Sequence, residues 1–333
     1  MKNLPLVSVT IPLYNAEKYL GACLESLLIQ TLKNLEVIVV DDCSTDSSPV
    51  LAESYLEKFG GRLKIITLPQ NTGSGAVPRN VGLEYAQGKY VFFMDADDLI
   101  VDNALERLYN FAEEYRAEVI YMERCYLCDA EKNLTLAAWT KAILKNKILF
   151  ESENLGERVH MLINFHFYWP PWSKFLRRDF LIDNDIKFPQ MTIAEDVVWT
   201  FKILCLSKNF LRIPTPLYIY RSNETSMMGR KRSLESEIIF WTNPLILGLD
   251  CLDEFMRGLE YFQKNPVVRL QVLNFFALMQ FDNMKDALGS LDAAEVYEIF
   301  LREFTKAGST QPALISYLLL MTNLYRNELK ALT

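Results

Sequence analysis

The chain contains 333 residues, carries a formal net charge of -7 and is 50% hydrophobic. Because 12% of the residues are also aromatic, the chain can bury a core, and an intrinsically disordered protein is excluded. The excess of acidic residues argues against a protein that coats nucleic-acid phosphates, so we expect no nucleic-acid partner. The length exceeds that of a single domain of about 100–150 residues, which predicts two substructures.

The first third of the chain alternates predicted strands with predicted helices. Short β-branched or apolar runs predict strands at 6–11, 35–40, 62–67 and 90–94. Apolar residues at helical spacing predict a helix through 20–28 with Asn15 as its N-cap, and further helices at 48–59, 76–87 and 102–115. This order predicts an α/β fold with a Rossmann-like, doubly wound and mostly parallel sheet.

Polar residues follow three of these strands, as PLYN at 12–15, DDCSTD at 41–46 and DADD at 95–98. Ligands of such sheets bind beyond the carboxyl ends of the strands. Asp95 and Asp97 lie two residues apart, so both can approach one Mn²⁺ or Mg²⁺ whose remaining positions are filled by water and substrate phosphates. The alternative is a solvated turn that caps the next helix. No G-x-x-x-x-G-K-[ST] or G-x-G-x-x-G motif follows the first strand, so P-loop and dinucleotide sites lose their main support.

Four ordered segments give the chain a resemblance to a known family. They are VSVTIPLYNAEKYL at 7–20, ESLLIQTLKNLEVIVVDDCSTDSS at 25–48, AQGKYVFFMDADD at 86–98 and AEDVVW at 194–199. The chain resembles the bacterial family 2 glycosyltransferases that build capsules, exopolysaccharides and lipopolysaccharides and have the GT-A fold. The resemblance implies a catalytic domain at 1–225, with a nucleotide-sugar-binding half at 1–100 and an acceptor half at 101–225.

The resemblance also implies a donor site. Tyr14 would lie against the uracil of a UDP-sugar, and Asp42 would accept the uracil imide N–H. Arg79 would pair with phosphate or tie its loop to an acid. Asp97 would be the principal metal ligand, with Asp95 beside it. The full set of implied nucleotide-sugar-binding residues is Pro12, Tyr14, Asn15, Glu17, Asp42, Asn71, Gly73, Arg79, Asp95 and Ala96.

The AEDV motif is where the resemblance places the chemistry. Inverting transfer requires one carboxylate to take the proton of the attacking hydroxyl, and the resemblance assigns this general base to Asp196. Glu195 would bind the acceptor or orient Asp196. Trp169 and Trp172 are candidate platforms for the acceptor sugar, and core aromatics are the alternative for both.

These observations predict an inverting, metal-dependent transferase that moves a sugar from a UDP-sugar to a hydroxyl of a glycan or lipid-linked glycan. The alternatives are a nucleotidyltransferase acting on sugar phosphates and a catalytically silent glycan-binding subunit. The sequence predicts a helical region at 226–333. This region would pack on the catalytic domain, form a homodimer or associate with a membrane surface. Contact with a membrane would be made by Arg230, Lys231 and Arg232. A solvated linker is the alternative for this basic run.

The predicted location is cytoplasmic, with possible peripheral contact at the inner face of the membrane. No secretory signal begins the sequence, and the longest charge-free runs, 238–249 and 307–325, are interrupted by proline or diluted by polar residues. The cysteines are therefore expected to be reduced thiols, at Cys23, Cys43, Cys125, Cys128, Cys205 and Cys251.

Overall fold

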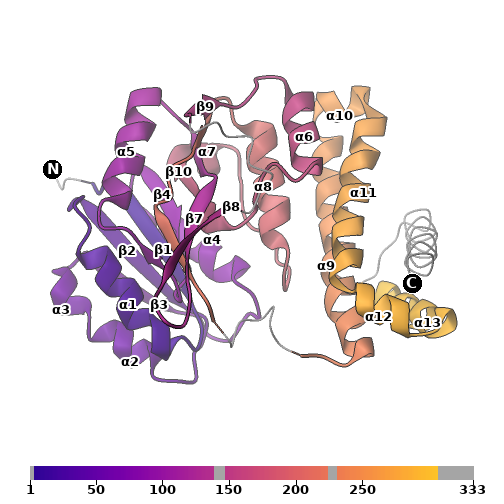
Figure 1. Ribbon diagram of the computed structural model, residues 1–333, viewed down its shortest axis with the longest axis horizontal. Coiled ribbons are helices and arrows are strands. Elements are labelled where there is room, and N and C mark those ends of the chain that lie inside the picture. Colours follow the sequence, from indigo (N-terminus) through magenta and orange to yellow (C-terminus); the bar gives the residue numbers. More distant parts are fainter. Residues whose placement is uncertain (1–3, 139–146, 224–230, 307–333) are drawn as a thin grey trace. The chain divides into compact units, whose positions relative to one another are not determined.

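The computed structural model describes residues 4–138, 147–223 and 231–306 (Figure 1). The chain forms two compact units. The first consists of Met1–Gln190 and Trp199–Asn223, and the second of Met191–Val198 and Glu224–Thr333. The short segment Met191–Val198, which precedes the boundary expected at residue 225, therefore groups with the second unit.

The first unit is built on an eight-stranded sheet with the order β3-β2-β1-β4-β10-β6-β11-β9. Its strands are β1 (Val7–Leu13), β2 (Leu35–Asp41), β3 (Leu63–Thr67), β4 (Tyr90–Phe93), β6 (Val119–Met122), β9 (Leu149–Phe150), β10 (Lys174–Arg177) and β11 (Phe210–Ile213). The strands β1 to β4 are parallel neighbours, as are β6 and β11, whereas β9 and β10 run antiparallel to theirs. The prediction of a mostly parallel α/β sheet is confirmed.

Helices cover both faces of this sheet. The buried residues Leu20 and Leu24 of α1 and Leu105 of α5 share one hydrophobic cluster with Val7 and Val9 of β1. The opposite face of β1 receives α4, because a Cβ on Gly82 would lie 2.8 Å from the Cβ of Thr10. The helices of the first unit are α1 (Glu17–Leu28), α2 (Ser48–Glu53), α3 (Leu56–Phe59), α4 (Ala76–Tyr85), α5 (Ala104–Tyr115), α6 (Leu155–Ile163), α7 (Arg178–Asp183) and α8 (Glu195–Leu206), of which α8 begins in the second unit.

Two local predictions are wrong. The N-cap of α1 is Ala16 and not Asn15, whose side chain binds the loop after β2 instead. The helix expected at 48–59 is two short helices, α2 and α3, which are separated by Ser54 and Tyr55.

The direction of β10 decides which residues reach which edge of the sheet. We call the edge where β1, β2 and β4 end the carboxyl edge, and the opposite edge the amino edge. Because β10 is antiparallel, Lys174 at its start pairs with Tyr121 of β6, while Arg177 at its end pairs with Tyr90 at the start of β4. The aromatic segment before β10 therefore reaches the carboxyl edge, and Arg177 lies at the amino edge.

A second sheet of four strands lies in the same unit, with the order β5-β12-β7-β8. Its strands are β5 (Leu99–Ile100), β7 (Arg124–Cys128), β8 (Leu134–Ala138) and β12 (Tyr218–Arg221). β12 pairs antiparallel with β5, the strand that directly follows Asp98. This pairing brings residues near 220 to the acidic turn at 95–98.

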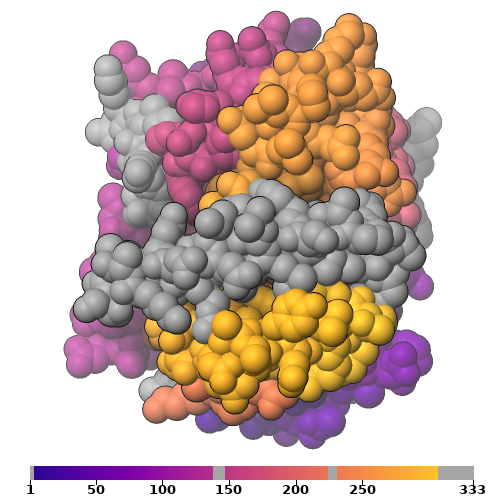
Figure 2. All heavy atoms as spheres, turned by 90° about the vertical axis from the view of Figure 1, so that its right-hand side faces the viewer, coloured from indigo at the N-terminus to yellow at the C-terminus, as the bar shows by residue number. Residues whose placement is uncertain are grey.

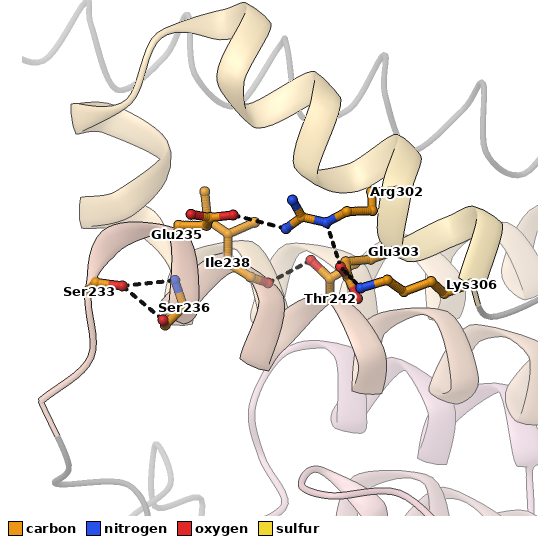
Figure 3. Close-up of polar contacts among 8 residues, drawn as sticks. All are labelled: Ser233, Glu235, Ser236, Ile238, Thr242, Arg302, Glu303 and Lys306. Carbon is orange, nitrogen blue, oxygen red and sulfur yellow. Dashed lines mark hydrogen bonds and ion pairs between the residues drawn. The ribbon is translucent and has the colours of Figure 1, made fainter.

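The second unit is helical, as predicted. Its helices are α9 (Leu234–Arg257), α10 (Glu260–Lys264), α11 (Pro266–Asn283), α12 (Lys285–Ser290) and α13 (Ala293–Lys306), and Figure 2 shows their side chains in orange to yellow. α9 and α11 approach closely at Gly248, where a Cβ would lie 2.3 Å from the Phe276 ring. The Ser233 side chain caps α9, and Arg302 of α13 pairs with Glu235 of α9 at 3.0 Å (Figure 3). Such exposed ion pairs contribute about 1 kcal/mol at most.

The basic run before α9 is only partly available for a membrane surface. Arg230 lies outside the described residues. Arg232 pairs with Glu237 at 3.3 Å, and its guanidinium lies 3.7 Å from the centre of the Phe240 ring. Among the residues that the structure describes, no helix combines the length and the apolar character needed to cross a bilayer. Homodimerisation through these helices stays a prediction.

Candidate functional site

The loops after β1 and β2 are tied to each other at the carboxyl edge. The Asn15 side-chain oxygen accepts hydrogen bonds from the backbone N–H groups of Thr45 (2.8 Å) and Asp46 (3.3 Å), and the Asn15 N–H donates to the Ser44 hydroxyl. Asn15 and Cys43 have positive φ angles of 47° and 60°. Such a conformation is uncommon outside glycine and is frequent at functional sites, so these loops are held in defined, locally strained shapes.

Tyr14 presents an accessible ring beside these loops. Its side chain is 47% exposed, whereas Pro12 is half-buried. Glu17 accepts a hydrogen bond from the backbone N–H of Ser47 at 3.0 Å and so helps to begin α2. Tyr14 thus retains the free face that stacking on a base requires, while Glu17 has a structural partner.

Asp42 holds the loop that follows β3. The residue is 3% exposed, and its carboxylate accepts hydrogen bonds from the Thr72 N–H (2.9 Å), the Thr72 hydroxyl (3.0 Å) and the Asn71 amide (3.2 Å). Burial raises the pKa of Asp42 above its usual value, and the bonds from Thr72 oppose that rise. Gly73 follows with a φ of 77°, which favours glycine. Asp42 and the loop at 71–73 are therefore brought together, and their roles in binding a nucleotide stay predictions.

Arg79 ties its helix to the acidic turn. Its Nη2 lies 2.8 Å from Oδ1 of Asp95, and Arg79 is 8% exposed. A Cβ on Gly75 would lie 2.4 Å from Arg79 Nη1, which explains a glycine at that position. The guanidinium also lies 5.6 Å from the centre of the Phe188 ring. Of the two alternatives for Arg79, the contact with an acid is present in the structure.

Asp97 is half-buried and is held by the segment after β12. Its Oδ2 accepts a hydrogen bond from the Asn223 amide at 2.8 Å, and its carbonyl accepts one from Arg221 Nε. Burial and then the charge of Asp95 raise the pKa of Asp97, against the hydrogen bond from Asn223. A cation bound nearby would instead favour the ionised form of Asp97 and lower its pKa.

Asp98 is the buried member of the turn. It is 1% exposed, and its carboxylate accepts hydrogen bonds from the Tyr218 hydroxyl (2.7 Å) and the Arg221 N–H (2.8 Å). Burial, followed by the charges of Asp97 and Asp95, raises its pKa well above the usual value. Asp98 has no access to a ligand, whereas Asp95 and Asp97 are partly exposed. Ala96 between them is buried.

The carboxylates of the acidic turn fit a hard divalent cation that also keeps ligands from outside the protein. In the ranges 4–138, 147–223 and 231–306, no three His, Cys, Asp or Glu side chains group closely enough to enclose a metal by themselves. The carboxylate oxygens of Asp97 and Asp95 are the ligand type that Mg²⁺ and Mn²⁺ prefer. Protein carboxylates would therefore supply part of the coordination and leave room for diphosphate oxygens and water.

The aromatic segment before β10 is supported by a buried lysine. Lys174 is 0% exposed, and its ammonium donates to the carbonyl oxygens of Tyr168 (3.0 Å), Trp169 (3.0 Å) and Pro170 (3.2 Å). Trp169 is half-buried. Trp172 is 2% exposed and its ring stacks on another ring of the core, so it offers no free face to a sugar.

Glu195 and Asp196 occupy the first turn of α8. Ala194 immediately before them has a φ of 63°, an unusual conformation for alanine. Glu195 is 8% exposed and Asp196 is half-buried. Of the two acids, Asp196 is the more accessible.

Three residues of the site were not predicted from the sequence: Tyr218, Arg221 and Asn223. They contact acids 120 or more positions earlier, and no local motif marks them. The basic residues Arg177 and Arg178 do not belong to this site. Arg177 pairs with Glu118 at the amino edge, the opposite edge of the sheet from the acidic turn.

An α/β sheet of this topology, with an acidic turn after β4 and polar loops after β1 and β2, is typical of the GT-A fold. Comparison with solved structures agrees on the fold. Residues 1–349 of TarS from Staphylococcus aureus, in complex with UDP-GlcNAc, superpose with a TM-score of 0.69 at 24% identity over 96% of this chain and 88% of that one. The mannosyltransferase PcManGT of Pyrobaculum calidifontis, in complex with GDP-Man and Mn²⁺, gives 0.52 at 15% identity over 98% and 88%.

Sequence comparison places the chain more narrowly. A family model described as Glycosyl transferase family 2 matches residues 8–178. EpsH of Bacillus subtilis, named as a glycosyltransferase, is 32% identical over 78% of this chain and 74% of its own length. TarP of Staphylococcus aureus, a poly(ribitol-phosphate) beta-N-acetylglucosaminyltransferase, is 32% identical over 61% of this chain and 59% of its own length. The chain belongs to glycosyl transferase family 2.

Family membership settles the class of reaction. The protein is an inverting, nucleotide-sugar-dependent glycosyltransferase. The nucleotidyltransferase and silent-subunit alternatives are set aside.

Proposed function

We propose that the protein transfers a sugar from a UDP-sugar to a hydroxyl of a bacterial cell-surface glycan or its lipid-linked precursor. The acidic turn at 95–98 carries this proposal, because it offers two carboxylates beside the loops that present Tyr14 and Asp42. The relatives give it further support: TarS was solved with UDP-GlcNAc, and TarP acts on a poly(ribitol-phosphate) acceptor.

The donor would be held at the carboxyl edge. Tyr14 stacks on the uracil through its exposed ring, and Asp42 is the proposed acceptor for the imide N–H, since a carboxylate only accepts hydrogen bonds. Pro12, Asn15 and Glu17 shape this pocket through the two tied loops.

The phosphate end of the donor would face the acidic turn. Asp97 is the main metal ligand in this proposal, and Asp95 contacts the ribose or a metal-bound water. Mn²⁺ or Mg²⁺ bound there would neutralise the charge that develops on the leaving diphosphate. The ion pair with Arg79 fixes the direction of the Asp95 carboxylate and partly neutralises its charge. The complex of PcManGT with Mn²⁺ supports the choice of metal.

Asp196 would act as the general base. Its carboxylate removes the proton from the acceptor hydroxyl while that oxygen attacks the anomeric carbon from the side opposite the diphosphate, which inverts the configuration. Glu195 orients Asp196 or binds the acceptor. Trp169 remains a candidate platform for the acceptor sugar, since its half-buried side chain lies on the segment that Lys174 fixes.

The donor assignment is tested by incubating the full chain with Mn²⁺, an acceptor glycan fraction and a panel of UDP-, GDP- and dTDP-sugars, then measuring released nucleotide. Acceptor-dependent release is expected with a UDP-sugar. Release from GDP- or dTDP-sugars alone would contradict the uracil pocket, and EDTA should stop the reaction.

The base is tested with Asp196→Asn, which keeps the size of the side chain but removes its basicity. We expect kcat to fall by about 10²–10⁴-fold, the usual contribution of a general base, with Mn²⁺-dependent UDP binding retained. Glu157→Gln is the matched control, because Glu157 is an acid in the first turn of another helix, α6. Normal transfer by the Asp196 variant would show that another group takes the proton.

A further inference from the structure

Tyr218 connects two members of the acidic turn through a single oxygen atom. Its hydroxyl accepts a hydrogen bond from the backbone N–H of Asp95 at 3.2 Å and donates one to Oδ2 of Asp98 at 2.7 Å. A phenolic hydroxyl can do both at once, because it has one proton to donate and lone pairs to accept with. The residue is 0% exposed, so no ligand can reach this hydroxyl.

The ring of Tyr218 is fixed by the core of the first unit. It stacks on Trp172 with 4.4 Å between ring centres and 4° between ring planes, and it meets Phe92 of β4 edge-on at 6.2 Å. Trp172 in turn lies in the short helical turn just before β10. Since neither neighbour leaves the ring room to move, the position of the hydroxyl is set by the packing of the sheet.

Asp98 completes the anchor. Both of its carboxylate oxygens accept hydrogen bonds from β12, one from Tyr218 and one from the Arg221 N–H, and its own N–H donates to the Asp95 carbonyl at 3.2 Å. The third acid of the DADD sequence therefore binds the protein and not a substrate.

We propose that Tyr218 is a positioning residue for the donor's metal site: it holds the turn so that Asp95 and Asp97 face the ligand in a fixed orientation. This inference rests on the metal-dependent function proposed above and adds the residue that orients the ligands. Groups that orient metal ligands affect affinity by about 10–100-fold when they are removed. Loss of the Tyr218 hydroxyl should therefore weaken metal binding more than it slows the step after binding.

The chain contains a matched control for this test. Tyr90 is also a buried tyrosine of a sheet strand, with 2% exposure, a hydroxyl that donates to Glu113 at 2.6 Å and a ring stacked on Phe175 at 5.0 Å. It lies at the amino edge. Tyr218→Phe and Tyr90→Phe each remove one tyrosine–carboxylate hydrogen bond and leave the stacked ring in place.

The experiment titrates Mn²⁺ at a fixed UDP concentration and measures UDP binding to the full chain and both variants. We expect the Mn²⁺ midpoint to rise about tenfold for Tyr218→Phe and less than twofold for Tyr90→Phe. At saturating Mn²⁺, kcat of Tyr218→Phe should stay within about threefold of the unaltered protein.

Each other result has a distinct meaning. Equal midpoint shifts for the two variants, or a fall in kcat alone, would overturn the positioning role. Absence of Mn²⁺-dependent UDP binding in the unaltered protein would overturn the proposed metal-dependent function and this inference with it. If Tyr218→Phe does not fold, Asp98→Asn takes its place, because it alters the same hydrogen bond from the carboxylate side. The midpoint should then rise by a similar factor, and an unchanged midpoint would refute the proposal.

Discussion

The amino and carboxyl edges of the eight-stranded sheet both carry acidic side chains, but the partners of these groups differ. At the amino edge, Glu36 accepts hydrogen bonds from Ser8 (2.7 Å), the Gln87 N–H (2.7 Å) and Lys64 (2.8 Å). Glu113 binds Lys89 and Tyr90 there. Burial alone would raise the pKa of Glu113, but these two hydrogen bonds outweigh it and lower that pKa.

At the carboxyl edge the balance is reversed. Asp42, Asp97 and Asp98 all have raised pKa values, mainly because they are buried, and the last two also because acids follow one another along the turn. Their ionised forms therefore weaken the folded state at neutral pH unless a cation binds. At the amino edge hydrogen bonds outweigh the effect of burial on Glu113, whereas at the carboxyl edge burial disfavours the ionised forms of Asp42, Asp97 and Asp98 despite their hydrogen bonds. Groups of this kind concentrate at functional sites.

Asp97→Asn, at the carboxyl edge, should have the largest effect on ligand binding. The amide keeps the hydrogen-bonding shape but removes a charge, so Mn²⁺-dependent UDP binding should weaken by at least about 100-fold. The metal-free variant should unfold about 2 °C higher, because an unfavourable buried charge is gone. Calorimetric titration and thermal unfolding measure the two effects. A variant that binds Mn²⁺ and UDP normally would remove Asp97 from the ligands.

Glu36→Ala, at the amino edge, should lower the stability of the protein and leave UDP binding unaltered. It leaves the Ser8 hydroxyl and the Gln87 N–H without their carboxylate, so we expect the free energy of unfolding to fall by about 2–3 kcal/mol. Urea unfolding measures this change. UDP binding should be unaltered at a temperature where the variant is folded. Reduced UDP affinity in the folded variant would mean that the two edges are not independent.

The smallest effect concerns pH. Between about pH 7 and pH 5, Glu113 keeps its stabilising contribution, because that contribution is complete above the usual value of 4.5. Asp97 has a raised pKa, so the metal-free folded protein takes up protons before the unfolded chain does, and its stability rises as pH falls toward that pKa. Metal binding needs the carboxylate ion and weakens over the same range.

The measurement for this prediction is the unfolding temperature with and without Mn²⁺ plus UDP. The difference between the two should shrink by a few degrees from about pH 7 to about pH 5. Asp97→Asn should show little difference at either pH. A difference that grows as pH falls would contradict the direction of the pKa shift.

The sequence predicted the parts of the fold and site that depend on local pattern. The β-branched runs of β1 and β2 and the acids directly after β4 are visible within a few residues, because a buried parallel strand and a strand-end turn each have a local composition. β10 was not predicted as an antiparallel member of the sheet, since KFLR has no feature that fixes its direction.

The sequence analysis also did not identify the residues that hold the acids of the turn. Tyr218 and Arg221 lie in a four-residue strand, and the neighbouring strand that leads back to the acidic turn, β5, has only two residues. Their role depends on tertiary pairing across more than 100 positions. The N-cap prediction for Asn15 failed for the same reason, because a loop 30 positions away competes for its side-chain oxygen.

The distance along the chain between the acidic turn and its anchor has a consequence during protein synthesis. Asp98 precedes Tyr218 by 120 residues. At a translation rate of about 5–20 residues per second, the three acids emerge from the ribosome on the order of ten seconds before the tyrosine that fixes them. A nascent chain that has folded only its first strands would therefore carry an unanchored cluster of negative charge, and the acidic turn would be fixed late, when β12 joins the second sheet.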